Sequence, residues 1–206
     1  MDFFVRESRA IVDGPMAMIR YGTCGGLSEI AVPGKVAVAS GGSGCVMRNP
    51  NAFTHLYNKD NSSSQSSHEA EPYLYFDVCP SDASLSQLVK DTLSAELGAD
   101  SFVEGVNVTA DSFYSSQGRH DDRFVDENQH TVQDVVKHYL QATSTEMETF
   151  VLFHLAKCSP VEIKATAAAI VLANRLVGTV VEGDVLKHIE EVGGMAVLHA
   201  VTHVQL

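Results

Sequence analysis

The sequence predicts an α/β fold in which strands and helices form separate layers. Short apolar runs bounded by glycine or proline, such as residues 35–39, are typical of buried strands. Longer segments with apolar residues at helical spacing, such as residues 84–97, alternate with these runs. With 206 residues, 45% of them hydrophobic, the chain is long enough for one substantial core, so we expect a single domain over 1–206.

The first half of the chain predicts two helices and two strands. Residues 3–12 mix apolar and charged side chains as a surface helix does, and residues 16–21 form a buried strand that stops at Gly22. Residues 35–39 are the next strand. Residues 84–97 predict a helix with Ser84 as its N-cap and Gly98 just after its end.

The second half continues the alternation. Residues 102–110 predict one strand, residues 146–156 a helix, and residues 184–204 a closing amphipathic helix. Residues 167–173 fit either a strand or a buried helix.

Residues 58–71 include a serine-rich stretch, with five serines between positions 58 and 67, that predicts a flexible insert without chemistry. The chain opens on a peripheral helix, whereas the first strand normally starts such a sheet. We therefore expect N-terminal strands to precede residue 1.

The net charge of −12 argues against nucleic acid or an anionic membrane as the main partner, because both attract cationic surfaces. An anionic substrate must then be held by a few local arginines. The four cysteines form no Cys-x-x-Cys pair, so neither a zinc knuckle nor a redox dithiol is indicated. Without a signal peptide or a membrane-length apolar run, we expect a cytoplasmic protein with reduced thiols.

A glycine cluster from Gly22 to Gly26 follows the strand that contains Arg20. We interpret it as a loop whose backbone amides approach an anion while the hydroxyl of Thr23 and the guanidinium of Arg20 add hydrogen bonds. Glycine clusters after strands are also typical of plain turns.

An aromatic ring, an amide and a guanidinium follow the predicted strand over residues 102–110. Phe113 offers a stacking face, the amide of Gln117 both donates and accepts, and Arg119 donates, which matches the O2, N3 and O4 edge of uracil. The alternative is a polar loop in which Phe113 is a core residue.

Two acidic residues flank a methionine at the expected start of the helix over residues 146–156. A glutamate there can accept hydrogen bonds from two ribose hydroxyls, while Met147 covers the face of the sugar. Glu146 and Glu148 would also simply complement a helix dipole.

Taken together, the motifs Gly-Thr-x-Gly-Gly, Phe-Tyr-x-x-Gln-x-Arg, Glu-Met-Glu and Asn-Arg-Leu at 174–176 resemble the nucleoside phosphorylase family, and within it the uridine phosphorylases. The resemblance covers nearly the whole chain apart from the serine-rich insert. It implies a layered α/β/α domain with a mixed central sheet. It also implies that family members carry further phosphate and ribose ligands upstream, so we expect this chain to bind uridine but to turn it over poorly.

The resemblance assigns roles position by position. Arg175 stands where purine enzymes keep an aspartate that protonates the base, which favours a pyrimidine, and Cys24 stands where many relatives have threonine or serine. The implied phosphate ligands are Arg20, Gly22 and Thr23; the ribose ligands are Thr23, Glu146, Met147 and Glu148; the base ligands are Cys24, Gly25, Phe113, Gln117, Arg119 and Arg175, of which Arg119 and Gln117 are catalytic.

The implied reaction is phosphorolysis of uridine, and of deoxyuridine if the 2′-position is tolerated, to uracil and the pentose 1-phosphate in pyrimidine salvage. Phosphate is the co-substrate, with no cofactor and no metal, and the family forms homodimers or larger homo-oligomers. Three alternatives stay open: a purine nucleoside phosphorylase, a nucleosidase that uses water, and a catalytically impaired nucleoside-binding partner subunit.

Overall fold

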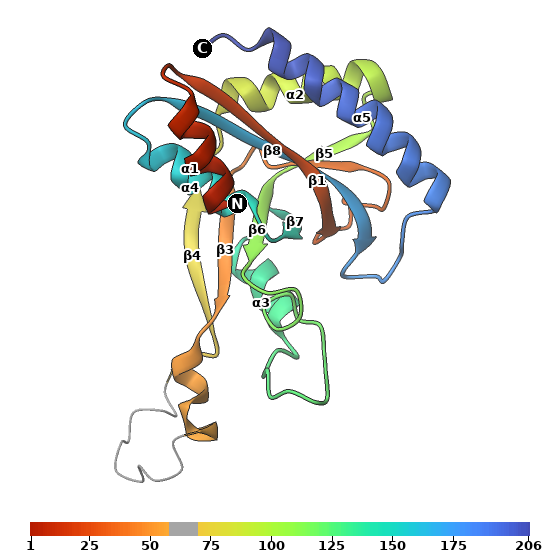
Figure 1. Cartoon of the computed structure of the whole chain (residues 1–206). Coiled ribbons are helices and arrows are strands. Elements are labelled where there is room, and N and C mark those ends of the chain that lie inside the picture. The colour runs from red at the N-terminus through yellow and green to blue at the C-terminus, as the bar shows by residue number, and fades with distance from the viewer. Residues whose placement is uncertain (58–69) are drawn as a thin grey trace.

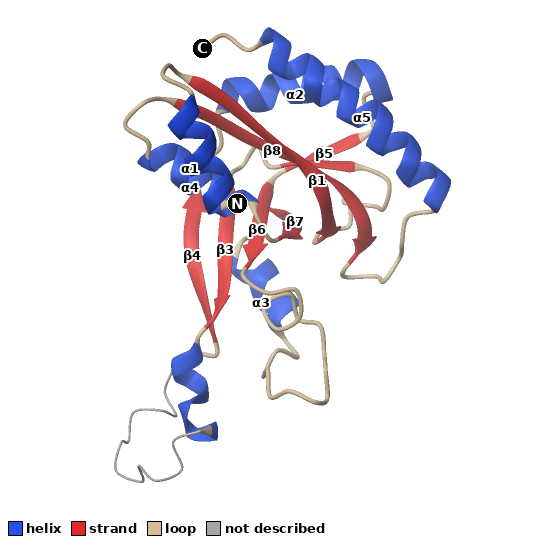
Figure 2. Ribbon diagram, in the orientation of Figure 1, coloured by secondary structure: helices blue, strands red, loops and turns tan. Residues whose placement is uncertain are grey.

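The computed structural model describes residues 1–57 and 70–206 (Figure 1). The predicted insert over 58–71 therefore lies almost wholly outside the described residues. Within them, eight strands form one sheet in the order β4-β3-β6-β7-β1-β8-β2-β5 (Figure 2). The strands are β1 Met16–Gly26, β2 Val36–Val38, β3 Ser43–Arg48, β4 Tyr73–Cys79, β5 Phe102–Glu104, β6 Val106–Ala110, β7 Ala142–Glu146 and β8 Ile163–Asn174. The helices are α1 Asp2–Ile11, α2 Ala83–Leu97, α3 Thr131–His138, α4 Thr149–Cys158 and α5 Gly183–His203, with a 3₁₀ helix η1 over Pro50–Leu56.

Helices cover both faces of the sheet. Helices α2 and α5 pack together over β8, β2 and β5 on one face, and α1 and α4 lie on the other (Figure 1). The sheet is mixed, because β1 runs parallel to β8 and antiparallel to β7. The predicted layered α/β/α fold with a mixed central sheet is confirmed.

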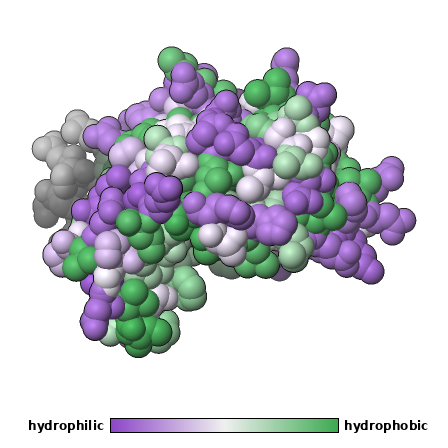
Figure 3. All heavy atoms as spheres, turned by 90° about the horizontal axis from the view of Figure 1, so that it is seen from above, coloured by the Kyte–Doolittle hydropathy of each residue, from purple (hydrophilic) through white to green (hydrophobic). Residues whose placement is uncertain are grey.

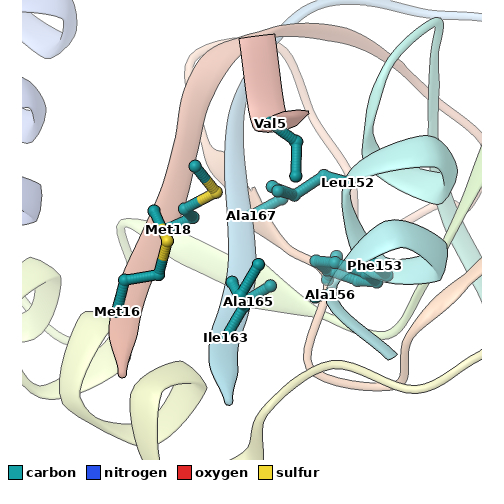
Figure 4. Packing of buried hydrophobic residues seen from close by; sticks show 10 residues of the cluster. Val5, Met16, Met18, Leu152, Phe153, Ala156, Ile163, Ala165 and Ala167 are labelled. Atoms are coloured by element: carbon teal, nitrogen blue, oxygen red, sulfur yellow. The ribbon is translucent and has the colours of Figure 1, made fainter. Parts of the chain in front are cut away.

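The core on the α1 and α4 side shows why residues 163–174 form a strand. Ile163, Ala165 and Ala167 point toward Phe153 of α4 (Figure 4). The intervening Ala168 and Ile170 pack on the other face, in the cluster that includes α2 and α5. A strand that is buried on both faces has a continuous apolar sequence, which a buried helix can also have. Only the packing therefore decides between strand and helix.

Helix α2 ends where the sequence predicts but begins differently. Gly98 follows it with φ of 95°, a conformation that suits glycine. The N-cap is Asp82 and not Ser84, because the carboxylate of Asp82 accepts a 2.8 Å hydrogen bond from the backbone N–H of Leu85. Ser84 instead donates to Asp82.

The prediction of one strand over residues 102–110 is wrong. Strand β5 pairs with β2 at one edge of the sheet, whereas β6 lies between β3 and β7. The chain changes partners at Gly105, where an added Cβ would lie 2.5 Å from Thr143 Cγ2 and 2.7 Å from the carbonyl oxygen of Gln141. Strands β3, β4 and β7 and helix α3 were not predicted.

Two motif-bearing segments also differ from their predicted structure. The cluster Gly22–Gly26 is not a loop: it forms the last part of β1 and stays paired with β8 across a bulge between Cys24 and Gly25. The expected helix over residues 146–156 begins only at Thr149, because Glu146 is the last residue of β7 and Glu148 is the N-cap of α4.

The outer surface over α2 and α5 intersperses hydrophilic and hydrophobic residues (Figure 3). None of the helices in the described part of the chain is long and apolar enough to cross a membrane.

Candidate active site

A cavity of about 310 Å³ lies where the carboxyl ends of two parallel strand pairs meet. Strands β1 and β8 form one pair, and β6 and β7 form the other. Strands β1 and β7 run antiparallel and pair at Gly25–Thr145 and Gly26–Ser144, so the ends of all four strands converge. Crevices outside the carboxyl ends of strands are the usual ligand sites of α/β sheets.

The cavity brings together all of the predicted site residues except Gly22. Its walls also contain three residues that sequence reasoning missed, namely Thr145, Leu172 and Ala173, whose common side-chain types carry no motif. Gly22 lies just behind the cavity, where an added Cβ would be 3.1 Å from Nη2 of Arg20. The predicted members of the wall are Arg20, Thr23, Cys24, Gly25, Phe113, Gln117, Arg119, Glu146, Met147, Glu148 and Arg175.

Arg20 lies between two carboxylates at one end of the cavity. Its Nε is 3.2 Å from Oε2 of Glu146, and its Nη2 is 2.5 Å from Oε2 of Glu148. Its Nη1 is buried and has no hydrogen-bond partner among the residues that the structure describes. Arg20 thus keeps the two N–H donors of Nη1 for a ligand, and Glu148, with 40% of its side chain exposed, keeps room to accept from one.

Glu146 is 5% exposed, and its surroundings favour the ionised carboxylate. Burial alone would raise its pKa, but the charge of Arg20 and the hydrogen bonds from Thr109, Asn107 and the backbone N–H of Glu148 together hold the pKa below its usual value.

The opposite end of the cavity is cationic. The guanidinium of Arg119 lies 3.7 Å over the ring of Phe113, and its Nη1 donates to the carbonyl oxygen of Phe113 at 2.8 Å and to Oε1 of Gln117. Arg175 Nη2 donates to the carbonyl oxygen of Gln117 at 2.9 Å. Within the described residues, neither Arg119 nor Arg175 pairs with a carboxylate.

The pKa values of both arginines reflect this environment. Burial, together with the neighbouring charge of Arg175, lowers the pKa of Arg119 to about 10, and burial lowers the pKa of Arg175. Both remain cations near neutral pH, so this end of the cavity suits electron-rich oxygens.

Arg175 is aimed into the cavity by its neighbours. The buried Asn174 donates to the carbonyl oxygens of Ser28 at 2.9 Å and Ala31 at 3.1 Å, which ties the end of β8 to the segment after β1. Its Oδ1 accepts from the backbone N–H of Leu176 at 2.9 Å, which fixes the turn after β8. The stem of Arg175 passes over Gly25, where an added Cβ would lie 2.9 Å from its Cγ. Gly25 therefore makes room for Arg175 as well as lining the cavity.

The loop that carries Phe113, Gln117 and Arg119 is held by hydrogen bonds. Asn128, 2% exposed, donates to the carbonyl oxygen of Arg119 at 3.0 Å, and Ser116 donates to Asp111. Asn128 lies outside the motif, and no pattern in the sequence singles it out.

Cys24 lines the cavity as a neutral thiol. It is 6% exposed, and burial, with a further contribution from Glu146 that outweighs the opposing effect of Arg20, raises its pKa to about 12. A neutral thiol is a poor nucleophile, so Cys24 shapes the wall without reacting. All four cysteines are free.

A larger recess of about 670 Å³ elsewhere contains none of the predicted site residues. Its two charged residues, Lys90 and Glu104, neutralise each other at 2.8 Å. The described residues contain no group of three or more His, Cys, Asp or Glu side chains arranged to hold a metal ion. We therefore place the candidate active site in the smaller cavity.

Comparisons with known proteins identify the family of the chain. Residues 1–200 match the family model described as "Phosphorylase superfamily". A structure from work on two diverse uridine phosphorylases in the oomycete Phytophthora capsici is 39% identical, with a TM-score of 0.91, and the match covers 100% of this chain and 72% of that one. No curated protein matches the chain.

Two more distant structures share the fold at 20% identity. A Trypanosoma brucei nucleoside phosphorylase that shows uridine phosphorylase activity has a TM-score of 0.67, and the match covers 91% of this chain and 64% of that one. Isoform 2 of uridine phosphorylase from Schistosoma mansoni has a TM-score of 0.61, with 92% and 60% covered. With its model match across 200 of 206 residues and a 39% identical structure over its full length, the chain belongs to the phosphorylase superfamily.

Proposed function

We propose that the protein is a uridine phosphorylase, which uses inorganic phosphate to convert uridine to uracil and ribose 1-phosphate. The observation that carries the proposal is the polarity of the cavity. At one end Arg119 and Arg175 have no carboxylate partner within residues 1–57 and 70–206, and at the other Arg20 lies between Glu146 and Glu148. The 39% identity to a structure from work on uridine phosphorylases supports it.

The cationic end suits the base. The ring of Phe113 offers a stacking face, and Arg119 donates toward a carbonyl oxygen of uracil. Arginine only donates, so its bond to Gln117 turns the amide oxygen toward Arg119 and leaves the amide N–H groups to donate elsewhere. Gln117 therefore serves as a further donor to a uracil oxygen.

The other end suits ribose and phosphate. Glu148 accepts from the two ribose hydroxyls, the exposed Met147 covers the sugar, and Arg20 with Thr23 binds phosphate. The buried and unpartnered Nη1 of Arg20 supports an anion at this position.

The reaction proceeds by orientation and electrostatics. A phosphate oxygen attacks C1′ of ribose while the bond from C1′ to N1 of uracil breaks, through a transition state with oxocarbenium character. The electron pair moves into the uracil ring, where Arg119 and Gln117 stabilise the charge on the oxygens. Uracil then takes up a proton from solvent. Because phosphate is the nucleophile, we propose that no cofactor takes part.

A pyrimidine substrate fits better than a purine. A purine base leaves after protonation, which requires an acidic group beside it. The two glutamates of this cavity lie at the sugar end with Arg20, and Arg175 occupies the base end. Arg119 and Arg175, the two cations at the base end, would repel a protonated purine.

The test is release of uracil from uridine by the purified protein, with and without phosphate, and with inosine as the purine comparison. Phosphate-dependent formation of uracil and ribose 1-phosphate, with inosine unused, is expected. Free ribose formed without phosphate would indicate a nucleosidase, and binding of uridine without turnover would indicate an impaired partner subunit.

We also propose that the protein works in pyrimidine salvage in the cytoplasm as a homodimer or larger homo-oligomer. Large exposed side chains such as Ile11, at 86%, and Leu140, at 88%, support burial against another copy. Light scattering of the purified protein tests the oligomeric state, and a monomer mass would contradict it.

A further inference from the structure

We propose that Asn107 and Thr109 are positioning residues that orient Arg20 through the carboxylate of Glu146. The inference rests on the proposed function in one respect, namely that Arg20 binds phosphate. It assigns to Glu146 the indirect role of orienting Arg20, instead of the direct contact with ribose that its motif suggests.

Neighbouring strands bring the three residues together. The register of β6 and β7 places Thr109 beside Glu146, with Asn107 two residues earlier on β6. Asn107 Nδ2 and Thr109 Oγ1 each donate to Oε1 of Glu146 at 2.6 Å. Asn107 and Thr109 are each 2% exposed, so water does not compete for these bonds.

The second oxygen of Glu146 is equally occupied. Oε2 accepts from the backbone N–H groups of Glu148 at 2.8 Å and Thr149 at 3.0 Å, and it contacts Nε of Arg20 at 3.2 Å. A carboxylate has about four lone-pair sites, and five donors already surround this one. Glu146 therefore has no acceptor left for a ribose hydroxyl, and among the side chains of the proposed phosphate and ribose ligands it contacts that of Arg20.

The hydrogen bonds around the carboxylate of Glu146 have one arrangement, because Thr109 and Asn107 each bond a further partner as well. The hydroxyl of Thr109 gives its only proton to Glu146, since it also accepts from the backbone N–H of Phe150 at 2.8 Å. Asn107 Oδ1 accepts from Ser144 at 3.0 Å, which turns the amide N–H groups toward Glu146. A buried group held in this way needs no reorganisation when phosphate arrives.

Four variants test the proposal. Thr109→Val removes the hydroxyl at nearly constant shape, Asn107→Leu removes the amide, and Thr109→Ser keeps the hydroxyl. The matched control is Thr166→Val, because Thr166 is also a buried strand threonine, but its hydroxyl bonds Ser86 at 2.7 Å and lies outside the cavity.

Steady-state kinetics should separate positioning from folding. We expect Thr109→Val and Asn107→Leu to raise KM for phosphate about tenfold or more, as loss of a bond to a charged group does, with KM for uridine changed less than about threefold. Thr109→Ser should restore the parent value, and Thr166→Val should leave it unchanged. A rise in both KM values, or an equal effect of Thr166→Val, would show a merely structural role.

A second measurement does not depend on activity. In NMR, the Nε–H of Arg20, assigned by its loss in Arg20→Lys, should exchange slowly in the parent because it is buried against Glu146. It should exchange faster in Thr109→Val and Asn107→Leu but not in Thr166→Val. Unchanged exchange in the first two variants would overturn the inference, whereas absence of phosphorolysis by the parent would overturn only the proposed function.

Discussion

Arg119 and Arg20 have opposite environments although they line one cavity. Arg20 contacts two carboxylates, whereas Arg119 has an aromatic ring, a carbonyl oxygen and an amide oxygen as partners. A cation without a counter-ion has most to gain from negative charge that forms on a leaving base. Arg119 is therefore the residue whose removal should affect catalysis most selectively.

Arg119→Ala should lower the turnover of uridine about 100-fold, because a buried donor aimed at a developing oxyanion contributes on the order of 3 kcal/mol. Its free energy of unfolding should fall by no more than about 1 kcal/mol, the value of its contact with Phe113. Arg123→Ala is the control, since Arg123 lies on the same loop but is 82% exposed and pairs with Asp121. Uridine turnover within about threefold of the parent would contradict the assignment.

Glu148→Gln should weaken uridine binding about tenfold, because a neutral amide accepts weaker hydrogen bonds from ribose hydroxyls. Phosphate binding should stay equal or become tighter, since the variant removes a carboxylate 2.5 Å from Nη2 of Arg20. Calorimetry with phosphate and with uridine measures both, with the surface variant Glu7→Gln as control. Equal losses for the two ligands would mean that Glu148 is structural.

At the scale of elements, side chains from the sheet satisfy the start of α4. The backbone N–H groups of Glu148 and Thr149 donate to Glu146, and that of Phe150 donates to Thr109. These are the groups that a helix leaves without partners in its first turn. The contact ties the position of α4 to the same residues that orient Arg20.

The first turn of α2 offers a direct test of its N-cap. Asp82→Ala should lower the free energy of unfolding by about 1 kcal/mol, because it leaves the N–H of Leu85 without its acceptor. Ser84→Ala should have a smaller effect, since Ser84 only donates to Asp82. Urea denaturation measures both, and a larger loss in Ser84→Ala would show that Ser84 is the N-cap after all.

At the scale of the whole molecule, a buried charge in the sheet makes the stability of the fold depend on pH. The pKa of Glu146 in the folded protein lies below the usual 4.5, so its ionised form stabilises the fold. This stabilisation is fully present above about pH 4.5 and is lost as the pH falls through the lower folded value.

We therefore expect the free energy of unfolding to fall as the pH is lowered below about 4.5, and to fall less steeply in Glu146→Gln than in the parent. Urea denaturation across this range measures the slopes. Glu7→Gln, at an exposed position, should keep the parent slope. Equal slopes for Glu146→Gln and the parent would show that Glu146 does not contribute.

The sequence predicted which residues meet in one cavity better than it predicted the bounds of helices and strands. Motif residues such as Phe113 and Glu148 are chemically distinctive, and the cavity gathers them as expected. Asn107 and Thr109 escaped notice because each is an ordinary polar residue in a strand, and their importance arises only from the neighbouring strand. The roles of individual motif residues stay predictions.

By itself, the sequence determined the fold class, the amphipathic helices α2 and α5, and most of the residues that meet in the cavity, because these depend on local periodicity and on side-chain chemistry. Only the tertiary structure decided that residues 102–110 divide at Gly105, that residues 22–26 stay in a strand, and that the carboxylate of Glu146 is already occupied. The physical reason is that each of these features depends on contacts with segments distant in the chain, such as Gln141 and Thr143 at Gly105 and β8 beside β1.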